Sequence, residues 1–360
     1  MNIGYIVSSM KKTGLTKIIY NTAINLFPNN NIVIFELNPE KVDSEYKTHL
    51  LDCGVKFVDL NISNVRVINS LRKIHVALNE NNIDVIHAHC LRSIILVGML
   101  NKFSNIKSVC TLHSYIAYNY VGEFGPLKAK IYSTLVLLAA KTFSKIVTVS
   151  KSIGKLYQQY NNLETSSIQN GVDFDPERKA KIRNEPIKYI YTGSISKRKQ
   201  IVFLCEGFQN FAKDKDVQLL LLGDGPLLNE LNDKYEENIK FVGRVDNVDK
   251  YLDSCDYFIS CSESEGLPNA VMEAMAIGLP CVLSDIPPHL ELLQGDDNGF
   301  NYQLNNYDEF ISVLNKSYSM SSEQFALMSE KSLQKISNTF NVKNMANKHY
   351  ELYESLLSKC

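Results

Sequence analysis

Two glutamates eight residues apart are the residues of this chain best suited to chemistry, and they lie in the stretch SESEGLPNAVMEAMAIGLP. Glu273 falls in a segment of helical periodicity, where its carboxylate can accept hydrogen bonds from both hydroxyls of a ribose. Glu265 precedes that segment and can bind a sugar hydroxyl, although an acid at this position also simply complements a helix dipole. Gly266, Leu267 and Pro268 open the helix, with Pro268 expected in its first turn, and the amides there suit a phosphate. The pattern therefore favours a ligand that carries both hydroxyls and phosphate.

Parallel sheets are expected to position these residues, because apolar runs of strand length alternate with helical segments along the chain. Examples are DVIHAH (84–89), SVCTLH (108–113), KIVTVS (145–150) and YIYTGS (189–194). This alternation is typical of α/β proteins with doubly wound parallel sheets. Ligands of such sheets bind beyond the carboxyl ends of the strands. We therefore expect the site in a cleft between two domains of this kind.

The length and the distribution of charge divide the chain in two. A chain of 360 residues exceeds one ordinary core. Residues 1–170 hold 18 basic and 10 acidic residues, whereas the remainder holds 20 and 29. We predict an N-terminal domain over 1–172, a linker rich in charge and proline over 173–187, and a nucleotide-binding domain over 188–340. The last helix, 341–360, is expected to pack back on the first domain.

Composition and missing motifs exclude several classes of protein. A chain with 45% hydrophobic and 21% charged residues is neither disordered nor fibrous. It has no P-loop, GxSxG or GxGxxG motif, which removes the NTPase, serine hydrolase and dinucleotide dehydrogenase interpretations. The acidic pair Asp214 and Asp216 precedes a strand, and His87 and His89 lack a third ligand, so we predict no metal and no cofactor. The absence of a basic leader or a long apolar run predicts a cytoplasmic protein.

The glutamate pair followed by EAMAIGLP resembles the signature of the retaining glycosyltransferases of family 4. The resemblance covers nearly the whole chain and implies the GT-B fold of two facing Rossmann-like domains. It implies that Glu265 lies near the donor sugar and that Glu273 binds the ribose. The stretch GSISKRKQ resembles the family pattern GRLxxxKG, so Gly193 is retained and Lys199 matches the diphosphate-binding lysine. Ser194 replaces the usual arginine and Gln200 the closing glycine, and Arg198 or Lys197 is the candidate to compensate.

Other landmarks follow in the order that the family has them. The segment FVGRVD resembles the one beside the nucleotide base, which implicates Arg244 and Val245. In MKKTGLT, Gly14 permits close approach of a phosphate to the backbone, while Thr13 replaces a glycine. TLHSY resembles the family's active-site histidine, which implies that His113 reaches the donor sugar and diphosphate. IHAH resembles the family's strand that ends in a histidine. That histidine is His89 here, and it is expected on the acceptor side.

The resemblance implies a retaining, metal-independent hexosyltransferase that uses a nucleotide-sugar, in first place a UDP-sugar. The expected acceptor is a saccharide on a polyprenyl diphosphate, as in capsule, O-antigen or exopolysaccharide synthesis, and no nucleic acid is expected as a partner. Because Ser194 and Thr13 depart from the family pattern, a catalytically idle subunit that binds a nucleotide or a partner chain is the alternative. Epimerisation and phosphorolysis, two other GT-B chemistries, lack their signatures here.

A basic stretch between Arg92 and Lys155 suggests a membrane surface as a further partner. It holds nine basic residues against one acid, Glu123. Lys128, Lys130 and Lys141 flank an apolar segment too short to span a bilayer, and an aromatic insert precedes it: Tyr115, Tyr118, Tyr120 and Phe124. The segment is either a buried core helix or a surface that lies on anionic lipid, which would make the protein peripheral on the inner face of the membrane.

Overall fold

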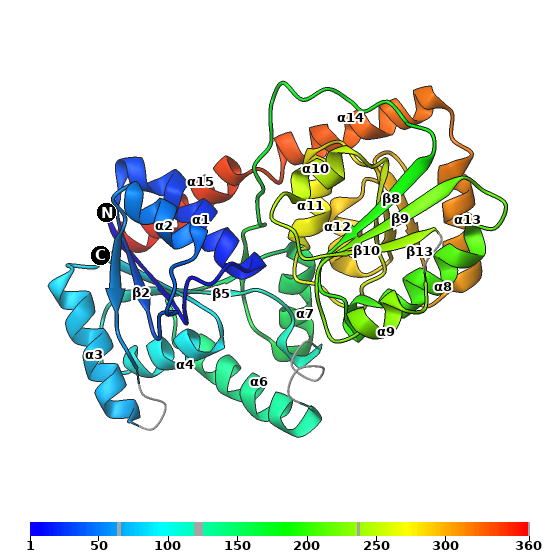
Figure 1. The fold of residues 1–360 in the computed structure, drawn as a ribbon. Coiled ribbons are helices and arrows are strands. Elements are labelled where there is room, and N and C mark those ends of the chain that lie inside the picture. The colour runs from blue at the N-terminus through cyan, green and yellow to red at the C-terminus, as the bar shows by residue number, and fades with distance from the viewer. Residues whose placement is uncertain (63–65, 119–124, 236–237, 359–360) are drawn as a thin grey trace. The chain divides into compact units, whose positions relative to one another are not determined.

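A computed structural model describes residues 1–62, 66–118, 125–235 and 238–358 (Figure 1). The chain divides into two compact units. The first consists of Met1–Gly171 together with Val342–Cys360, and the second of Val172–Asn341. Each unit is built around its own parallel sheet, as the alternation of strands and helices predicts.

The sheet of the first unit has seven strands among the described residues, in the order β3-β2-β1-β4-β5-β6-β7. Its strands are β1 (Asn2–Val7), β2 (Asn31–Glu36), β3 (Lys56–Asp59), β4 (Val85–His89), β5 (Lys107–Leu112), β6 (Lys145–Thr148) and β7 (Ser166–Ser167). All neighbouring pairs are parallel. Helices cover both faces of such a sheet, which explains why its central strands are apolar on both sides.

The sheet of the second unit has six described strands in the order β10-β9-β8-β11-β12-β13. They are β8 (Ile187–Thr192), β9 (Val217–Leu222), β10 (Ile239–Gly243), β11 (Tyr257–Ser260), β12 (Cys281–Ser284) and β13 (Gly299–Tyr302). When the strands of each sheet are numbered from its own first strand, both described sheets have the order 3-2-1-4-5-6, and the first sheet adds β7 at its end. Both are Rossmann-like, and the strand order reverses between β1 and β4 and between β8 and β11. These two reversal points are where such sheets bind ligands.

Helices complete both units. Those of the first unit are α1 (Gly14–Leu26), α2 (Glu45–Asp52), α3 (Val67–Glu80), α4 (Leu91–Leu100), α6 (Pro126–Ala140), α7 (Lys151–Asn161) and α15 (Val342–Leu357). Those of the second are α8 (Ile201–Phe211), α9 (Leu228–Asn232), α10 (Val248–Asp253), α11 (Asn269–Ala276), α12 (Pro287–Leu292), α13 (Tyr307–Tyr318) and α14 (Ser322–Asn338).

The last helix of the chain, α15, is part of the first unit. It packs against α1 (Figure 1). Met345, Ala346 and Tyr353 of this helix are buried in the same apolar cluster as Ile3 and Tyr5 of β1. The C-terminal segment therefore contributes to the core beneath the first sheet.

The predicted linker, 173–187, is bound to the second unit over its residues 173–186, and its last residue already begins β8. Arg178 forms an ion pair with Asp253 of α10. The backbone N–H of Lys181 donates to Ser329 Oγ at 2.8 Å, and that of Asn184 donates to Asp256 Oδ1 at 3.0 Å. These contacts fix the segment before β8 begins at Ile187.

Candidate functional site

The loops that follow β8 and β11 lie side by side because these two strands pair at the centre of the second sheet. The backbone N–H of Glu263 donates to the carbonyl oxygen of Arg198 at 3.0 Å. In return, Nη1 of Arg198 donates to the carbonyl oxygen of Ser264 at 2.6 Å. The stretches GSISKRKQ and SESEGLP, distant in the sequence, are thus joined by hydrogen bonds.

Lys199, Arg198 and Glu265 form a charged cluster in these two loops. Nζ of Lys199 donates to Oε1 of Glu265, and Nη1 of Arg198 lies 3.7 Å from its Oε2. The Glu265 side chain is only 10% exposed. Burial alone would raise the pKa of this carboxyl, but Lys199 and Arg198 outweigh that effect and lower it to about 2. Two cations therefore share one carboxylate, and the net positive charge suits a phosphate or diphosphate.

Position 194, where the family pattern has an arginine, is an exposed serine. The carbonyl oxygen of Ser194 accepts a hydrogen bond from the Tyr191 hydroxyl at 3.0 Å. Of the two residues expected to compensate for the missing arginine, Lys197 is exposed, whereas Arg198 lies against Glu265. Arg198 is thus the second cation of this cluster.

Gln200 adopts the left-handed backbone conformation, with φ 55° and ψ 40°. A residue with a Cβ pays about 1 to 2 kcal/mol for this conformation, which explains why the family pattern has glycine here. Nε2 of Gln200 donates to Oε1 of Glu263 and, at 3.2 Å, to Oδ1 of Asn305. These two hydrogen bonds offset part of the backbone cost and hold the end of the lysine-bearing turn.

The Gly-Asp-Gly turn after β9 packs directly on the loop after β8. Gly223 has φ 137°, and a Cβ at this position would overlap the carbonyl oxygen of Gly193. A Cβ at Gly225 would overlap the carbonyl oxygen of Ile195 in the same way. Both glycines are therefore required by close contact between backbones, which shapes the loop that carries Gly193.

Helix α11 begins one residue later than the sequence suggested. Pro268 is its N-cap, with ψ 109°, and is not in its first turn as expected. Gly266, Leu267 and Pro268 are buried, and Glu273 is half-buried in the helix. Glu265 lies in the loop before the helix, as the sequence suggested.

Arg244 and Val245 follow β10, the edge strand of the second sheet. The backbone N–H of Gly223 donates to the carbonyl oxygen of Gly243 at 2.8 Å, which joins this edge to the glycine turn. Arg244 is exposed and Val245 half-buried. Their contact with a nucleotide base stays a prediction.

In the first unit, β1, β4, β5 and α15 bring together a cluster of aromatic side chains: Tyr5, His87, His89, His113, His349 and Tyr353. Nδ1 of His89 lies 3.0 Å from Nε2 of His113. One step deeper, Nε2 of His87 lies 2.7 Å from Thr111 Oγ1, and its Nδ1 lies 2.6 Å from the hydroxyl of Tyr353.

Burial keeps the histidines of this cluster neutral. It lowers the pKa of His113 to about 4 and that of His349 to about 3. The pKa values of His87 and His89 are also well below their usual range, first through burial and then through the neighbouring histidines. His113 can therefore act at neutral pH as a hydrogen-bond donor or acceptor without charge.

Thr13 and Gly14 stand where the loop after β1 enters α1, and β1 pairs with β4 at the reversal point of the first sheet. Gly14 is the first residue of α1, and Thr13 is its N-cap. The Thr13 hydroxyl accepts from the backbone N–H of Thr16, which completes a capping box. A helix-capping role thus accounts for threonine where the family pattern has a glycine.

His289 is a candidate that the sequence reasoning missed. It follows β12 and is fully buried, with Nδ1 3.0 Å from both oxygens of Ser284. Burial lowers the pKa of His289 to about 4, although the nearby Glu265 carboxylate acts in the opposite direction. A histidine just beyond a buried strand, like His113, was the signal that could have identified it.

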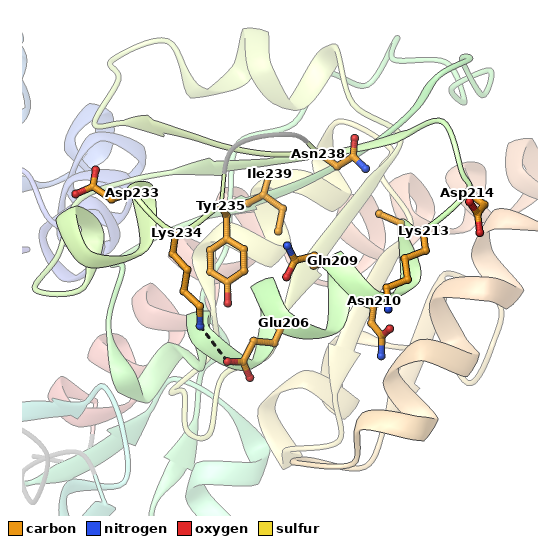
Figure 2. A pocket seen from close by; sticks show the side chains of 11 residues that line it. Glu206, Gln209, Asn210, Lys213, Asp214, Asp233, Lys234, Tyr235, Asn238 and Ile239 are labelled. Atoms are coloured by element: carbon orange, nitrogen blue, oxygen red, sulfur yellow. Dashed lines mark hydrogen bonds and ion pairs between the residues drawn. The ribbon is translucent and has the colours of Figure 1, made fainter.

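A cavity of about 820 Å³ lies at the opposite, amino edge of the second sheet. Figure 2 shows Asp214 and Lys213 from the loop before β9, and Asn238 and Ile239 where β10 begins. Asp214, half of the acidic pair, thus lies away from the loops that follow the strands. This position does not suit the predicted donor site.

Helix α6 exposes an apolar stripe, so it is neither a wholly buried helix nor a wholly polar surface. Its exposed apolar side chains are Leu127 (74%), Ile131 (51%), Leu135 (44%) and Leu138 (61%). At 3.6 residues per turn they fall within about 80° of the circumference, between Lys128 on one flank and Lys130 and Lys141 on the other.

The aromatic residues expected beside this stripe differ from one another. Tyr115 is only 7% exposed and packs on Tyr157, so it belongs to the core and cannot lie at a membrane surface, whereas Tyr118 is 57% exposed. Tyr120 and Phe124 lie outside the described residues. In the ranges that the structure covers, no helix is long and apolar enough to cross a membrane.

Comparison with known proteins relates both units to glycosyltransferases. The family described as "Glycosyltransferase Family 4" matches residues 27–176, and "Glycosyl transferases group 1" matches residues 186–319. An Escherichia coli protein named UDP-Gal:alpha-D-GlcNAc-diphosphoundecaprenol alpha-1,3-galactosyltransferase is 24% identical over 358 residues, covering 91% of this chain and 90% of its own. The O-antigen biosynthesis glycosyltransferase WclY of Escherichia coli is 24% identical over 369 residues, 99% of each chain.

Solved structures of the same architecture include Anabaena HepE in complex with UDP and glucose. It aligns with a TM-score of 0.78 at 18% identity, over 99% of this chain and all of its own. The protein is thus a glycosyltransferase with the GT-B fold, as the sequence predicted. Its first unit matches glycosyltransferase family 4 and its second unit matches the glycosyl transferases of group 1.

Proposed function

We propose that the protein is a retaining hexosyltransferase that moves a hexose from a UDP-sugar to a saccharide on a polyprenyl diphosphate. The product would enter a surface polysaccharide such as capsule, O-antigen or exopolysaccharide. The single observation that carries this proposal is the cluster of Lys199, Arg198 and Glu265 at the reversal point of the second sheet. The donor and lipid-linked acceptor in the name of the galactosyltransferase relative support it, as does UDP in the HepE structure.

The two cations would bind the diphosphate of the donor. Negative charge on the diphosphate grows as its bond to the sugar breaks, so Lys199 and Arg198 stabilise the transition state more than the ground state. The ammonium of Lys199 has three donors and can retain Glu265 while it contacts phosphate oxygens. Arg198 would thus supply the positive charge that the family pattern places at position 194, where this chain has a serine.

Other residues would bind the remaining parts of the donor. Glu273 accepts from the ribose hydroxyls, Glu265 holds a hydroxyl of the hexose, and His113 donates to the sugar or diphosphate. The groups around the phosphates and base are those of the glycine loops, the α11 entry and the edge strand: Gly14, Gly193, Gly266, Leu267, Pro268, Arg244 and Val245.

The state of Glu265 favours retention without a covalent intermediate between this carboxylate and the sugar. Its carboxylate is held by two cations and has a pKa of about 2, which makes it a weak nucleophile toward the sugar. We therefore expect the acceptor hydroxyl to attack from the face that the diphosphate leaves, guided by the diphosphate itself. No metal ion is required in this scheme, because the two cations supply the positive charge.

We further propose that the stripe on α6 docks on an anionic bilayer, which brings the enzyme to its lipid-linked acceptor. The segment Pro126–Ala140 contains no acidic residue, and each basic flank adds about 1 kcal/mol per lysine near an anionic surface. The protein would then be cytoplasmic and peripheral on the inner face of the membrane.

The donor is tested by thermal shift with UDP-, GDP- and ADP-sugars, followed by transfer to a synthetic polyprenyl-diphosphate saccharide. A donor at 100 times its Kd stabilises the protein by about 2.7 kcal/mol, and the product is expected to be α-linked by NMR. A protein stabilised by none of the donors would contradict the proposal. Slow hydrolysis of the donor without acceptor separates the enzyme from the alternative, an idle nucleotide-binding subunit.

Membrane docking is tested by co-sedimentation with vesicles of phosphatidylcholine, with and without phosphatidylglycerol. We expect binding only to the anionic vesicles, loss of binding in high salt, and loss in Leu127→Ser/Leu138→Ser and in Lys128→Glu/Lys130→Glu. Leu327→Ser, at a residue 57% exposed on α14 of the other unit, is the matched control. Binding that is the same with and without anionic lipid, and the same in both double variants, would refute this docking surface.

A further inference from the structure

His89 and His113 meet as part of a regular ladder between two paired strands. β4 and β5 are parallel, with His89 level with Thr111. Side chains two residues apart on a strand point to the same face. Each histidine of β4 contacts the side chain two residues beyond the one level with it. Nε2 of His87 lies 2.7 Å from Oγ1 of Thr111, and Nδ1 of His89 lies 3.0 Å from Nε2 of His113.

The ring of His89 is enclosed by protein groups. It is 2% exposed, with ring centroids 4.2 Å from His87 and 5.9 Å from Tyr5. Its contacts are thus with the first unit itself, and its expected place on the acceptor side stays a prediction. His113, by contrast, is half-buried at the end of β5.

The surroundings of His89 favour a proton on its Nδ1, between the two rings. Both imidazoles are neutral at pH 7, so each carries one N–H and one lone pair. Nε2 of His89 is buried and has no hydrogen-bond partner among the described residues. If His113 were the donor, His89 would have to carry its own proton on this nitrogen, as a buried and unsatisfied N–H. The reverse arrangement leaves only a lone pair unsatisfied there, which is the less costly state.

We propose that His89 is a positioning residue, which donates from Nδ1–H to Nε2 of His113 and thereby holds His113 as the Nδ1–H tautomer. Nδ1–H of His113 then becomes the hydrogen-bond donor presented to the hexose or diphosphate of the sugar nucleotide. The second step rests on the proposed function, because the sugar nucleotide is the ligand assumed for His113.

The tautomer is read directly from the ring nitrogens of ¹⁵N-histidine in NMR spectra, with His113 assigned by its loss in His113→Gln. We expect a protonated Nδ1 and an unprotonated Nε2 for His113 in the unaltered protein. A protonated Nε2 on His113 would overturn the proposal.

Two variants of His89 with nearly the same shape isolate the hydrogen bond from packing. The amide of His89→Asn can donate from about the position of Nδ1, whereas His89→Leu cannot donate at all. Loss of one hydrogen bond to substrate corresponds to about tenfold, so we expect kcat/KM for the UDP-sugar to fall about tenfold or more in His89→Leu. His89→Asn should stay within about threefold of the unaltered protein.

The outcomes separate this inference from the proposed function. Equal losses of turnover in His89→Asn and His89→Leu, with both folded by circular dichroism, would overturn the positioning role. His75→Leu, an exposed histidine of α3, is the control and should behave as the unaltered protein. If the predicted tautomer is observed but His113→Ala turns over normally, His89 still sets the tautomer, and the role of His113 at the donor is what fails.

Discussion

Replacing Glu265 with glutamine should destabilise the second unit by an amount that depends on pH. Glutamine retains the shape of the side chain but removes its charge, so the variant resembles the protein with Glu265 protonated. Lys199 and Arg198 then face each other without the carboxylate that they share. The folded pKa of about 2 compares with 4.5 for an ordinary glutamate. At about 1.4 kcal/mol per pKa unit, the carboxylate contributes about 3 kcal/mol at pH 7.

The sign of the pH dependence follows from the direction of the shift. Because the pKa is lower in the folded state, the stabilisation is complete above the unfolded value of 4.5 and is lost as the pH falls toward 2. The difference between the unaltered protein and Glu265→Gln should therefore fall from about 3 kcal/mol at pH 7 to about 2 kcal/mol at pH 3.5.

Denaturant-dependent hydrogen exchange, read on peptides of β8 and β11, measures this difference in the second unit itself. Asp296→Asn is the control, since Asp296 and its partner Lys316 are both more than half exposed and such pairs contribute less than about 1 kcal/mol. A difference for Glu265→Gln that is as small as the control, or equal at the two pH values, would refute the reasoning.

Substitutions at three residues test their individual roles. Glu273→Ala should weaken UDP binding at least tenfold by calorimetry, since two charge-assisted hydrogen bonds of about 1.5 to 3 kcal/mol each are lost; unchanged affinity in a folded variant would contradict the ribose role. Lys199→Ala should lower kcat about 100-fold or more in a transfer assay with a smaller change in the Kd of UDP, and a preserved kcat would exclude it as the leaving-group cation. Gln200→Ala and Gln200→Gly both lose the hydrogen bonds to Glu263 and Asn305, but only the glycine variant also loses the left-handed backbone strain. In thermal unfolding Gln200→Gly should therefore be more stable than Gln200→Ala by about 1 kcal/mol. The opposite order would contradict this account.

The sequence determined the fold of this protein because its signals are local. Continuous apolar runs mark strands buried on both faces, and the helical segments between them impose parallel pairing. The same alternation located the residues that follow the strands, such as Lys199, Glu265 and His113. Since the carboxyl ends of parallel strands in one sheet share an edge, the meeting of Lys199 and Glu265 at the edge of the second sheet could be anticipated without coordinates.

The partners of these residues depended on contacts that no local pattern encodes. The sequence left Lys197 and Arg198 open as substitutes for the missing arginine, and only the packing of two loops placed Arg198 against Glu265. The left-handed backbone at Gln200 and the capping role of Thr13 are likewise geometric reasons for departures that appear in the sequence only as mismatches.

The histidine cluster shows the limit most clearly. His89 and His113 could be identified one by one, because each ends or follows a strand. Their mutual hydrogen bond, and the support of His87 by Tyr353 from a helix more than 250 residues away, exist only in the folded chain. Composition and periodicity specify which face of a strand or helix is buried, but the identity of the side chain that meets it is set by long-range packing. The sequence therefore specified the class of protein and the strands that bear its candidate site, and the tertiary structure decided the pairing and burial of the groups within it.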